Sequence, residues 1–285
     1  MDVRSLLDRY DIRPSKGLGQ SFLVAEWAYE RILEAARLTP DDVVLEVGPG
    51  LGTLTSRLAE QARQVIAVEL DARMVAILED TLAGLANVTV HQGDILETDL
   101  AALLAPWVGG DQGAAHYKVV ANLPYYITSR ALRHLLTAAV RPQRMVLMVQ
   151  REVADRIVAA PGEMSLLAVS VQVFGAAERV CRVPANAFFP RPKVDSAVLA
   201  VELHPAPLVP QALLEPLFRV ARAGFQQKRK QLHNSLAANL GLGRETVERA
   251  LEQAGISPSI RPQSLAVEDW ARLAAALFSP EGAER

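Results

Sequence analysis

The sequence contains four consecutive residues whose types suit chemistry on the exocyclic amine of a nucleobase: Asn122, Leu123, Pro124 and Tyr125. The nitrogen of such an amine, for example adenine N6, is a poor nucleophile because its lone pair is delocalised into the ring. An Asn side-chain carbonyl and a backbone carbonyl beside a Pro, which has no N–H, can accept both amine hydrogens and localise that lone pair. Tyr125 offers a flat face for a base that has been flipped out of its stack. Asn and Pro are also frequent in turns, so the four residues alone indicate a site and a turn about equally.

A glycine-rich segment at 46–52, Glu-Val-Gly-Pro-Gly-Leu-Gly, is a second candidate site. It lies between an expected strand and an expected helix, where glycines allow a ligand to approach the backbone. The spacing of Gly48, Gly50 and Gly52 differs from the Gly-x-Gly-x-x-Gly pattern of dinucleotide-binding loops and resembles the version found in methyltransferases. Such a loop can pack against the methionine and ribose portions of S-adenosylmethionine, which has no phosphate. The carboxylate of Glu46 is then available to the loop and to the ligand amine.

Two acidic residues follow the next two expected strands. Glu69 ends the strand at 64–69, where a carboxylate can accept hydrogen bonds from both hydroxyls of a ribose. Asp94 follows the third strand and can accept from an adenine amino group, while Ile95 packs on the ring. For each acid taken singly, a solvent-exposed position at the end of a strand is favoured over a ligand contact. Together with Gly48 and Asn122 they follow four successive strands, so they converge on the crevice in which doubly wound sheets bind ligands.

Short β-branched runs alternate with helix-period segments from about Val43 onward, as expected for a parallel α/β sheet. Strands are predicted at 43–47, 64–69, 88–90, 117–121, 145–149, 178–183 and 197–203, with helices at 51–61 and 72–82. The segment 106–116, which contains three glycines, is predicted to be a loop. The fourth of these strands delivers Asn122 to its carboxyl end.

A domain boundary is predicted where three prolines fall between His204 and Pro210. The sequence after this point has no strand signal and contains helix-like segments at 213–223, 228–239, 244–253 and 267–277. We therefore expect a catalytic, cofactor-binding domain at 1–204 and a smaller helical domain at 205–285.

Composition sets further limits. The chain has 285 residues, half of them hydrophobic, and a formal net charge of −2, so a surface for nucleic acid must be a local patch. The single cysteine, Cys181, excludes an internal disulfide and a multi-cysteine zinc site, and it suits a reducing compartment. No apolar run approaches the ~20 residues of a membrane span, and the N-terminus lacks a signal-peptide pattern. These features favour a cytoplasmic protein.

Beyond the two candidate sites, several ordered motifs resemble those of the ribosomal RNA adenine dimethyltransferases, in particular the small-subunit dimethyladenosine transferase A family. They are Gly-Gln-Ser-Phe-Leu at 19–23, Val-Gln-Arg-Glu-Val-Ala at 149–154, Phe-Phe-Pro-Arg-Pro-Lys-Val-Asp-Ser at 188–196, Gln-Lys-Arg-Lys at 227–230 and Arg-Pro-Gln-Ser-Leu at 261–265. The resemblance covers nearly the whole chain and implies a Rossmann-like class I methyltransferase sheet with a smaller C-terminal helical domain. It also implies S-adenosyl-L-methionine as the cofactor.

The resemblance implies roles for individual residues. Those expected to contact or close over the cofactor are Gln20, Ser21, Leu23, Gly48, Gly50, Glu69, Asp94, Ile95 and Asn122. Tyr125 would stack on the target adenine and Phe188 would form the opposite wall, although the pattern around Phe188 suits a core residue equally well. The chain departs from the family at Ser21, which stands where Asn is usual, and at Tyr126, which stands where Asn is frequent. We expect Tyr126 to be a packing residue behind the site.

The densest basic stretch lies in the helical tail, in a part of the sequence (216–244) that contains no acidic residue. It comprises Arg219, Arg222, Lys228, Arg229 and Lys230, and four further arginines (Arg141, Arg144, Arg151 and Arg156) would extend it. Such a stretch fits contact with RNA phosphates, of which Arg222 and Lys228–Lys230 are the predicted main participants. The alternative is that these side chains form a solvent-exposed helix face, which is the commoner arrangement of charged residues on helices.

The predicted reaction is the S-adenosylmethionine-dependent dimethylation of adenosine N6, on two adjacent adenosines, in 16S RNA of the small ribosomal subunit. No metal is required, because the sulfonium is already an activated methyl donor and positioning can supply most of the catalysis. The predicted partners are small-subunit RNA and a pre-assembled small subunit, and the protein is expected to be a monomer. Two alternatives stay open: an RNA-binding assembly factor with secondary catalysis, and a large-subunit adenine methyltransferase of the antibiotic-resistance type. A small-molecule methyltransferase would explain neither the four residues from Asn122 to Tyr125 nor the basic tail.

Overall fold

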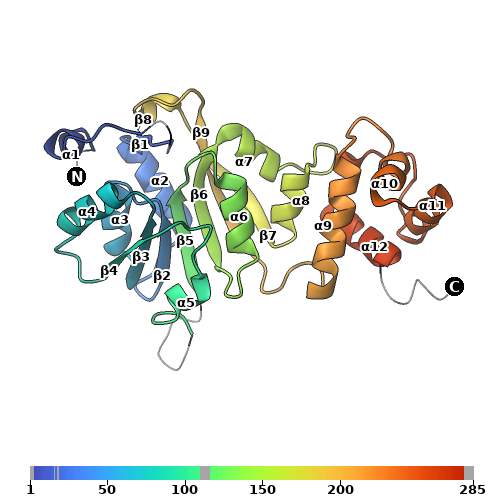
Figure 1. The fold of residues 1–285 in the computed structure, drawn as a ribbon, viewed down its shortest axis with the longest axis horizontal. Coiled ribbons are helices and arrows are strands. Elements are labelled where there is room, and N and C mark those ends of the chain that lie inside the picture. The colour runs from blue at the N-terminus through green and yellow to red at the C-terminus, as the bar shows by residue number, and fades with distance from the viewer. Residues whose placement is uncertain (1–2, 16, 18, 110–115, 279–285) are drawn as a thin grey trace. The chain divides into compact units, whose positions relative to one another are not determined.

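The computed structural model describes residues 3–15, 17, 19–109 and 116–278, and the chain divides into two compact units (Figure 1). The first unit comprises Met1–Ala154 and Ala177–Leu203, and the second comprises Asp155–Ala176 and His204–Arg285. The third crossing between the units, after Leu203, falls within a residue of the boundary predicted from the prolines. The structure differs from the prediction at Asp155–Ala176, which folds with the helical tail rather than with the sheet.

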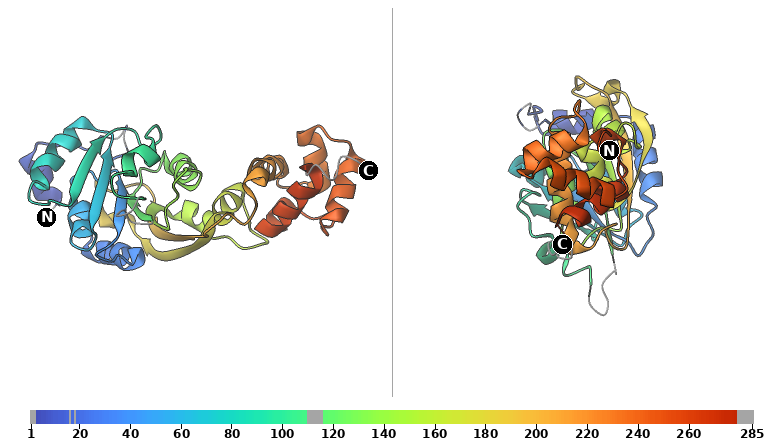
Figure 2. Two further views of the ribbon diagram at one scale, coloured as in Figure 1. Left: turned by 90° about the horizontal axis from the view of Figure 1, so that it is seen from below. Right: turned by 90° about the vertical axis from the view of Figure 1, so that its right-hand side faces the viewer.

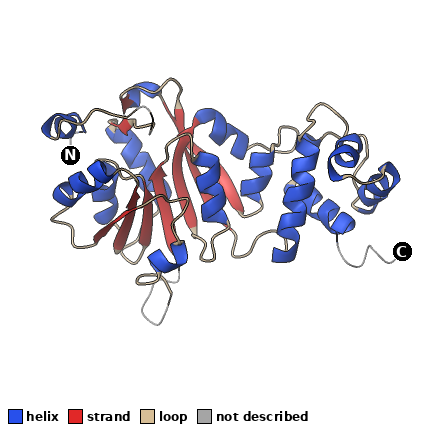
Figure 3. Cartoon of the chain, in the orientation of Figure 1, coloured by secondary structure: helices blue, strands red, loops and turns tan. Residues whose placement is uncertain are grey.

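A seven-stranded sheet forms the centre of the first unit, with the strand order β4-β3-β2-β5-β6-β9-β7 (Figure 3). Its strands are β2 (Val43–Val47), β3 (Gln64–Glu69), β4 (Val88–Gln92), β5 (Tyr117–Asn122), β6 (Arg144–Gln150), β7 (Gly175–Val183) and β9 (Ser196–Leu203). The five strands from β4 to β6 run parallel, and β9 runs antiparallel to β6. All seven predicted strands are present, and the predicted fold class is confirmed.

The order of the strands creates the position for a ligand site. Chain order reverses between β2 and β5, which lie side by side in the sheet, and ligands of doubly wound sheets bind at such a switch point. In the register between these strands Val47 pairs with Ala121, so Gly48, which follows β2, and Asn122, which ends β5, lie at the same level of the sheet. Every residue of β2 is buried, as is typical of a parallel strand that is covered on both faces.

Helices cover both faces of this sheet (Figures 1 and 2). They are α2 (Glu26–Ala36), α3 (Thr53–Ala59), α4 (Ala72–Thr81), α5 (Leu100–Leu104) and α6 (Thr128–Leu136). Helix α7 (Arg151–Ile157) begins in this unit and ends in the second. Asp71 and Asp99 begin α4 and α5 by accepting backbone N–H groups of the first turn, which is the usual role of an N-cap carboxylate. The predicted helix at 51–61 is shorter at both ends, because the glycine-rich segment continues to Gly52 in the left-handed region. The part of the predicted loop at 110–115 lies outside the described residues.

The part of the chain from α1 (Val3–Arg9) to β1 (Phe22–Leu23), called the N-terminal segment below, packs over the glycine-rich loop and α4. Helix α1 buries Val3, Leu6 and Leu7 in a cluster with Leu51 and Met74. The chain then leads to the short strand β1, which pairs with β8 (Phe188–Phe189) just after the 3-10 turn η1 (Ala185–Ala187). The segment between α1 and β1 is therefore held at both of its ends.

The second unit is built from helices around Trp270, which is fully buried. Its elements are α8 (Leu166–Gln172), α9 (Gln211–Phe225), α10 (Leu232–Leu240), α11 (Arg244–Gln253), η2 (Pro262–Ser264) and α12 (Val267–Phe278). The Trp270 ring lies 5.3 Å from the Phe225 ring, centroid to centroid. It also approaches Gly224 so closely that a Cβ there would lie 2.6 Å from a ring carbon, which explains a glycine inside α9.

One helix prediction in this unit was wrong at its start. The helix predicted at 228–239 begins only at Leu232, because the Lys230 N–H donates to the Gln227 carbonyl in a turn and the Leu232 N–H donates to Ile260. Lys228, Arg229 and Lys230 therefore lie in the turn between α9 and α10 and not on a helix face. No helix in the described part of the chain has the length and apolar character to cross a membrane.

Candidate functional site

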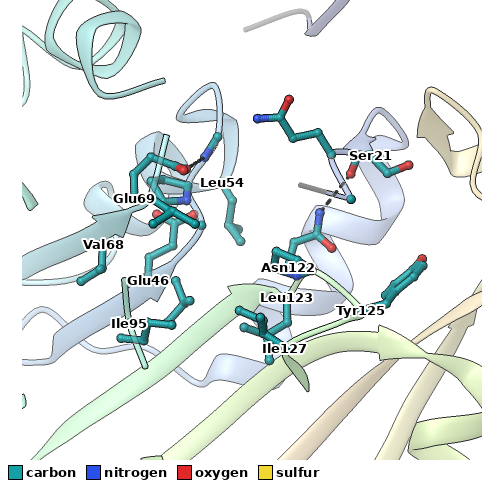
Figure 4. Close-up of a pocket in the computed structure, with 18 of the residues that line it drawn as sticks. Ser21, Glu46, Leu54, Val68, Glu69, Ile95, Asn122, Leu123, Tyr125 and Ile127 are labelled. Atoms are coloured by element: carbon teal, nitrogen blue, oxygen red, sulfur yellow. Dashed lines mark hydrogen bonds between the residues drawn. The ribbon is translucent and has the colours of Figure 1, made fainter. Parts of the chain in front are cut away.

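A pocket opens at the carboxyl ends of β2, β3, β4 and β5, and the N-terminal segment and β8 complete its wall (Figure 4). In Figure 4, Val68, Glu69 and Ile95 line one side of the pocket, and Ser21, Asn122 and Tyr125 line the other. The structure brings into this pocket every residue predicted for catalysis or cofactor binding: Gln20, Ser21, Leu23, Gly48, Gly50, Glu69, Asp94, Ile95, Asn122, Leu123, Pro124, Tyr125 and Phe188. Their individual roles stay predictions.

The glycine-rich loop needs its glycines for conformation and for close approach. Gly48 and Gly50 have φ angles of 68° and 58°, in the left-handed region that side chains rarely adopt. A Cβ at Gly50 would also lie 3.1 Å from the Phe22 ring, which packs directly on the loop. The loop thus keeps its backbone exposed to the pocket on one side and supported by an aromatic ring on the other.

Glu69 links this loop to the next one. One carboxylate oxygen accepts from the Gly50 N–H at 3.1 Å and the other accepts from the Asp71 N–H at 2.9 Å. Burial is the largest influence on this side chain and raises the pKa of the Glu69 carboxyl, while the two N–H donors act in the opposite direction. Each carboxylate oxygen retains a lone pair, so Glu69 can also accept from the hydroxyls of a ribose.

Glu46 is the most deeply buried acid of the pocket, with 1% of its surface exposed. Its Oε2 atom is buried and has no hydrogen-bond partner among the described residues. This burial raises the pKa of the Glu46 carboxyl to about 8. A buried acceptor without a partner is costly unless a ligand satisfies it, so the position suits a cationic group such as an ammonium.

Asn122 is oriented by the backbone of the N-terminal segment. Its amide nitrogen donates to the Ser21 carbonyl at 3.4 Å, which leaves the amide oxygen free to accept. The Ser21 hydroxyl points elsewhere and donates to the Pro190 carbonyl at 2.5 Å. Ser21 therefore acts on the site through its backbone, and the shorter side chain at this position serves to hold the loop that contains Pro190.

The backbone of the following residues leaves one carbonyl available. The Leu123 N–H donates to Met148 at 3.2 Å, and the Pro124 carbonyl accepts from Ile127 and from the Thr128 hydroxyl. Among the described residues no hydrogen bond ends on the Leu123 carbonyl oxygen. The Asn122 side-chain oxygen and the Leu123 backbone oxygen are thus available as the two acceptors that the sequence predicted for the hydrogens of an exocyclic amine.

Tyr125 and Phe188 are the aromatic residues expected on the two sides of the target base. The Tyr125 hydroxyl shares a hydrogen bond of 2.7 Å with the hydroxyl of Ser196, which is fully buried at the start of β9. Burial also raises the pKa of the Tyr125 phenol. Phe188 is 4% exposed and belongs to the hydrophobic core, yet it lines the pocket. Phe188 is thus a core residue that also lies at the pocket, and its role as the opposite wall for the target base stays a prediction.

Two further predicted cofactor contacts are partly engaged by the protein. One oxygen of Asp94 accepts from the Leu96 N–H at 2.9 Å, and the other is available to a ligand. The Gln20 amide accepts from the Ser15 N–H at 2.8 Å and donates to Asp71 at 3.2 Å. Gln20 thus links the N-terminal segment to the N-cap of α4, and its closing over the cofactor stays a prediction.

Sequence reasoning missed two residues at the pocket mouth. Tyr126, expected to pack behind the site, lines the pocket with 54% of its surface exposed, so that expectation was wrong. Arg130 on α6 is exposed and lines the same pocket. The direction of each side chain depends on the turn at 125–127, and no residue pattern in the sequence encodes it.

The basic residues divide into two groups. Arg222, Lys228, Arg229 and Lys230 are exposed on the helical unit, as a phosphate-binding role requires. Arg144, expected to extend the basic stretch, is 4% exposed and forms an ion pair with Glu202 that links β6 and β9. Because its side chain is buried, Arg144 does not add to the exposed basic surface. In the described part of the chain, no three His, Cys, Asp or Glu side chains are grouped as metal ligands would be.

Comparison with known proteins identifies relatives over nearly the whole chain. The family model described as "Ribosomal RNA adenine dimethylase" matches residues 13–278. The protein named "Ribosomal RNA small subunit methyltransferase A" of Dehalococcoides mccartyi is 43% identical over 271 residues, which is 95% of this chain and 91% of the relative. The protein of the same name from Moorella thermoacetica is 44% identical over 267 residues, covering 93% of this chain and 92% of the relative.

Two solved structures are similar as well. The 23S rRNA methyltransferase ErmE superposes with a TM-score of 0.70 and is 31% identical, covering 90% of this chain and 99% of that structure. A dimethyladenosine transferase from Plasmodium falciparum superposes with a TM-score of 0.71 and is 26% identical, covering 88% of this chain and 95% of that structure. Both share the sheet and the helical region with this chain.

Proposed function

Because this chain belongs to the ribosomal RNA adenine dimethylase family, we propose that it dimethylates N6 of adenosines in the 16S RNA of the small ribosomal subunit. The family fixes the reaction class, transfer of methyl groups from S-adenosylmethionine to adenine. The choice of the small subunit rests on relatives that carry this name and are 43–44% identical over 93–95% of the chain. The match to the 23S enzyme is lower, at 31%.

The pocket residues fit S-adenosylmethionine. The buried Oε2 of Glu46 lacks a partner and suits the ammonium of the methionine portion, and the backbone of Gly48 and Gly50 is open to the ligand. Glu69 accepts the ribose hydroxyls, and Asp94 accepts from the adenine amino group while Ile95 packs on its ring. When bound, the cofactor supplies a methyl group activated by the sulfonium.

The residues of the chain then act on the target adenosine. The base stacks on Tyr125 beside Phe188, and its N6 hydrogens are accepted by the Asn122 amide oxygen and the Leu123 carbonyl oxygen. This localises the N6 lone pair, which forms the new N–C bond as the S–C bond breaks. The proton on N6 leaves to solvent after the transfer, because methylation in this geometry makes the nitrogen acidic. A second round on the same nitrogen gives the dimethylated base.

The helical unit is proposed to hold the RNA. Arg222 and the turn Lys228–Lys230 provide exposed positive charge in a stretch of sequence that contains no acid. We propose that the enzyme acts as a monomer, in the cytoplasm, on a pre-assembled small subunit.

The observation that carries the proposal is the pair of free acceptors at Asn122 and Leu123 beside the Tyr125 ring. To test it, we would incubate the protein with labelled cofactor and small subunits that lack the modification, and map the labelled nucleosides. We expect label in N6-methylated adenosines of small-subunit RNA. Asn122→Ala should lower kcat by about 100- to 1000-fold, the usual loss when an oriented polar group of this kind is removed.

The matched control is Asn186→Ala, which changes an exposed Asn of the same unit outside the pocket and should leave kcat unchanged. Label confined to large-subunit RNA would overturn the proposed substrate. Undiminished dimethylation by Asn122→Ala at saturating cofactor would overturn the proposed mechanism.

A further inference from the structure

Tyr126 is a large aromatic side chain that the proposed reaction leaves unused. Its surface is 54% exposed. It lines the same pocket as Tyr125, its neighbour in the chain, but the two rings have different surroundings. The Tyr125 hydroxyl is bonded to Ser196 on β9, whereas no hydrogen bond to the Tyr126 hydroxyl occurs within the described residues.

The ring of Tyr126 is supported on one side by the N-terminal segment. A Cβ at Gly19 would lie 3.5 Å from the Tyr126 Cδ1 atom and 3.7 Å from its Cε1 atom, which are ordinary contact distances. The backbone at Gly19 therefore already packs close to the ring. One side of the ring is backed by protein while much of the remainder is open at the mouth of the pocket.

A positive charge accompanies this ring. Arg130 lies four residues after Tyr126 in the chain, is exposed and lines the same pocket. Its guanidinium makes no ion pair and no hydrogen bond to the described residues. An exposed aromatic face and an unpaired guanidinium that line the same pocket are the combination with which proteins bind a single-stranded nucleotide, since the ring stacks on the base and the cation contacts the phosphate.

We infer that Tyr126 stacks on a nucleotide adjacent to the flipped adenosine and that Arg130 contacts the phosphate backbone there. The inference rests on the proposed function, because it assumes that an RNA adenosine enters the pocket. A base that leaves its stack exposes the face of its neighbour, and a ring at the pocket mouth restores a stacking partner to that neighbour. Tyr126 is thus a substrate-positioning residue, separate from the groups that contact the reacting nitrogen.

The test compares Tyr126→Ala, Tyr126→Leu and Tyr126→Phe in steady-state methylation of small subunits that lack the modification, at saturating cofactor. If Tyr126 stacks on a base, Tyr126→Ala and Tyr126→Leu should raise the KM for subunits by about 10-fold. Tyr126→Phe keeps the ring, so its KM should stay near that of the wild type. The value of kcat should change much less than KM in all three variants. Trp27→Ala, which removes another exposed aromatic residue of this unit outside the pocket, should change neither value.

Arg130→Gln should also raise the KM for subunits. It should reduce the slope of log KM against log salt concentration by about 0.7, as expected for the loss of one phosphate contact on single-stranded RNA. An unchanged slope would remove Arg130 from the inference, and an unchanged KM for Tyr126→Ala would overturn the stacking role.

A purely structural role of Tyr126 gives a different result. If the ring only supports the loop at Gly19, then Tyr126→Ala should weaken cofactor binding in the absence of RNA. Tyr126→Leu should then bind the cofactor with an affinity near that of the wild type, because Leu fills the same space. That outcome, measured by titration with S-adenosylhomocysteine, would overturn the inference. Failure of the wild-type protein to methylate small subunits would instead overturn the proposed function, so the two failures are distinguishable.

Discussion

The pocket of the sheet unit and the basic turn of the helical unit use polar residues in opposite ways. In the pocket, the functional side chains of Glu69, Asn122 and Tyr125 are each fixed by a hydrogen bond to another segment of the chain. In the turn, the side chains of Lys228–Lys230 are exposed and make no ion pair or hydrogen bond with the described residues. Methyl transfer needs reacting atoms in one geometry, whereas phosphate contact needs only positive charge nearby. The difference in how the side chains are held therefore follows from the difference in task.

This contrast leads to different expectations for substitutions in the two regions. A pocket residue should be sensitive to small changes in shape, even when the type of side chain is kept. A residue of the basic turn should be sensitive to its charge and to the salt concentration, but tolerant of shape.

The largest effect is expected at Tyr125. Tyr125→Ala removes the stacking face and should lower kcat/KM for small subunits by about 100- to 1000-fold, because the adenine loses both binding energy and orientation. Tyr125→Phe keeps the face and loses only the hydrogen bond to Ser196, so its kcat/KM should stay within about 10-fold of the wild type. Cofactor affinity, measured by titration, should be nearly unchanged in both. An equal loss in the two variants would mean that the hydroxyl, and not the ring, makes the essential contact.

A smaller effect is expected from the basic turn. Neutralising Lys228, Arg229 and Lys230 together, each to Gln, should raise the KM for subunits by about 10- to 100-fold at moderate salt, with kcat unchanged. The slope of log KM against log salt should fall by about 2, since each phosphate contact on single-stranded RNA contributes about 0.7. Arg244 and Arg249 on α11 provide the control, because their replacement by Gln removes charge from the same unit outside the turn. A loss of equal size in the control would show that overall charge, and not the turn, governs binding.

The same contrast explains how far the sequence alone could predict the molecule. The strands were predictable because β2, β3 and β5 are short apolar runs. Glu69 and Asp94 were predictable as site residues because they lie at the carboxyl ends of β3 and β4, and strand ends converge at a switch point. The pocket residues carried signals of this local kind, so all of those predicted lie in one cavity.

Other features depend on contacts between segments that are distant in the sequence. The helix start at Leu232 is set by a hydrogen bond to Ile260, and the folding of Asp155–Ala176 with the tail is set by contacts such as Phe174 with Phe218, whose centroids lie 6.2 Å apart. The burial of Arg144 depends in the same way on Glu202. No local pattern contains these partners, which is why the sequence placed these features differently.

The last prediction concerns Glu46 and compares how the pocket and the basic turn respond to pH. The pKa of this carboxyl is 4.5 for a solvated Glu and is raised to about 8 by burial in the folded protein. Between these values the unfolded chain is ionised at this position while the folded chain keeps the proton. Unfolding then releases a proton, so the free energy of unfolding falls as pH rises from about 4.5 to about 8, by at most about 1.4 kcal/mol per pH unit, and levels off above that range.

Glu46→Gln removes this dependence, because an amide does not titrate. Urea unfolding of the wild type and the variant at pH 5.5, 6.5 and 7.5 should therefore show the variant gaining stability relative to the wild type at each step, by about 1 kcal/mol per pH unit. The Glu69 carboxyl, whose pKa is also raised by burial, is present in both proteins, and its negative charge is one cause of the raised pKa of Glu46. Lys228→Gln removes an exposed charge of the basic turn and should run parallel to the wild type over the same range. If the Glu46→Gln curve also ran parallel, the carboxyl would be ionised in the folded protein, and the pocket would have to hold a cation or solvent that stabilises it before the cofactor binds.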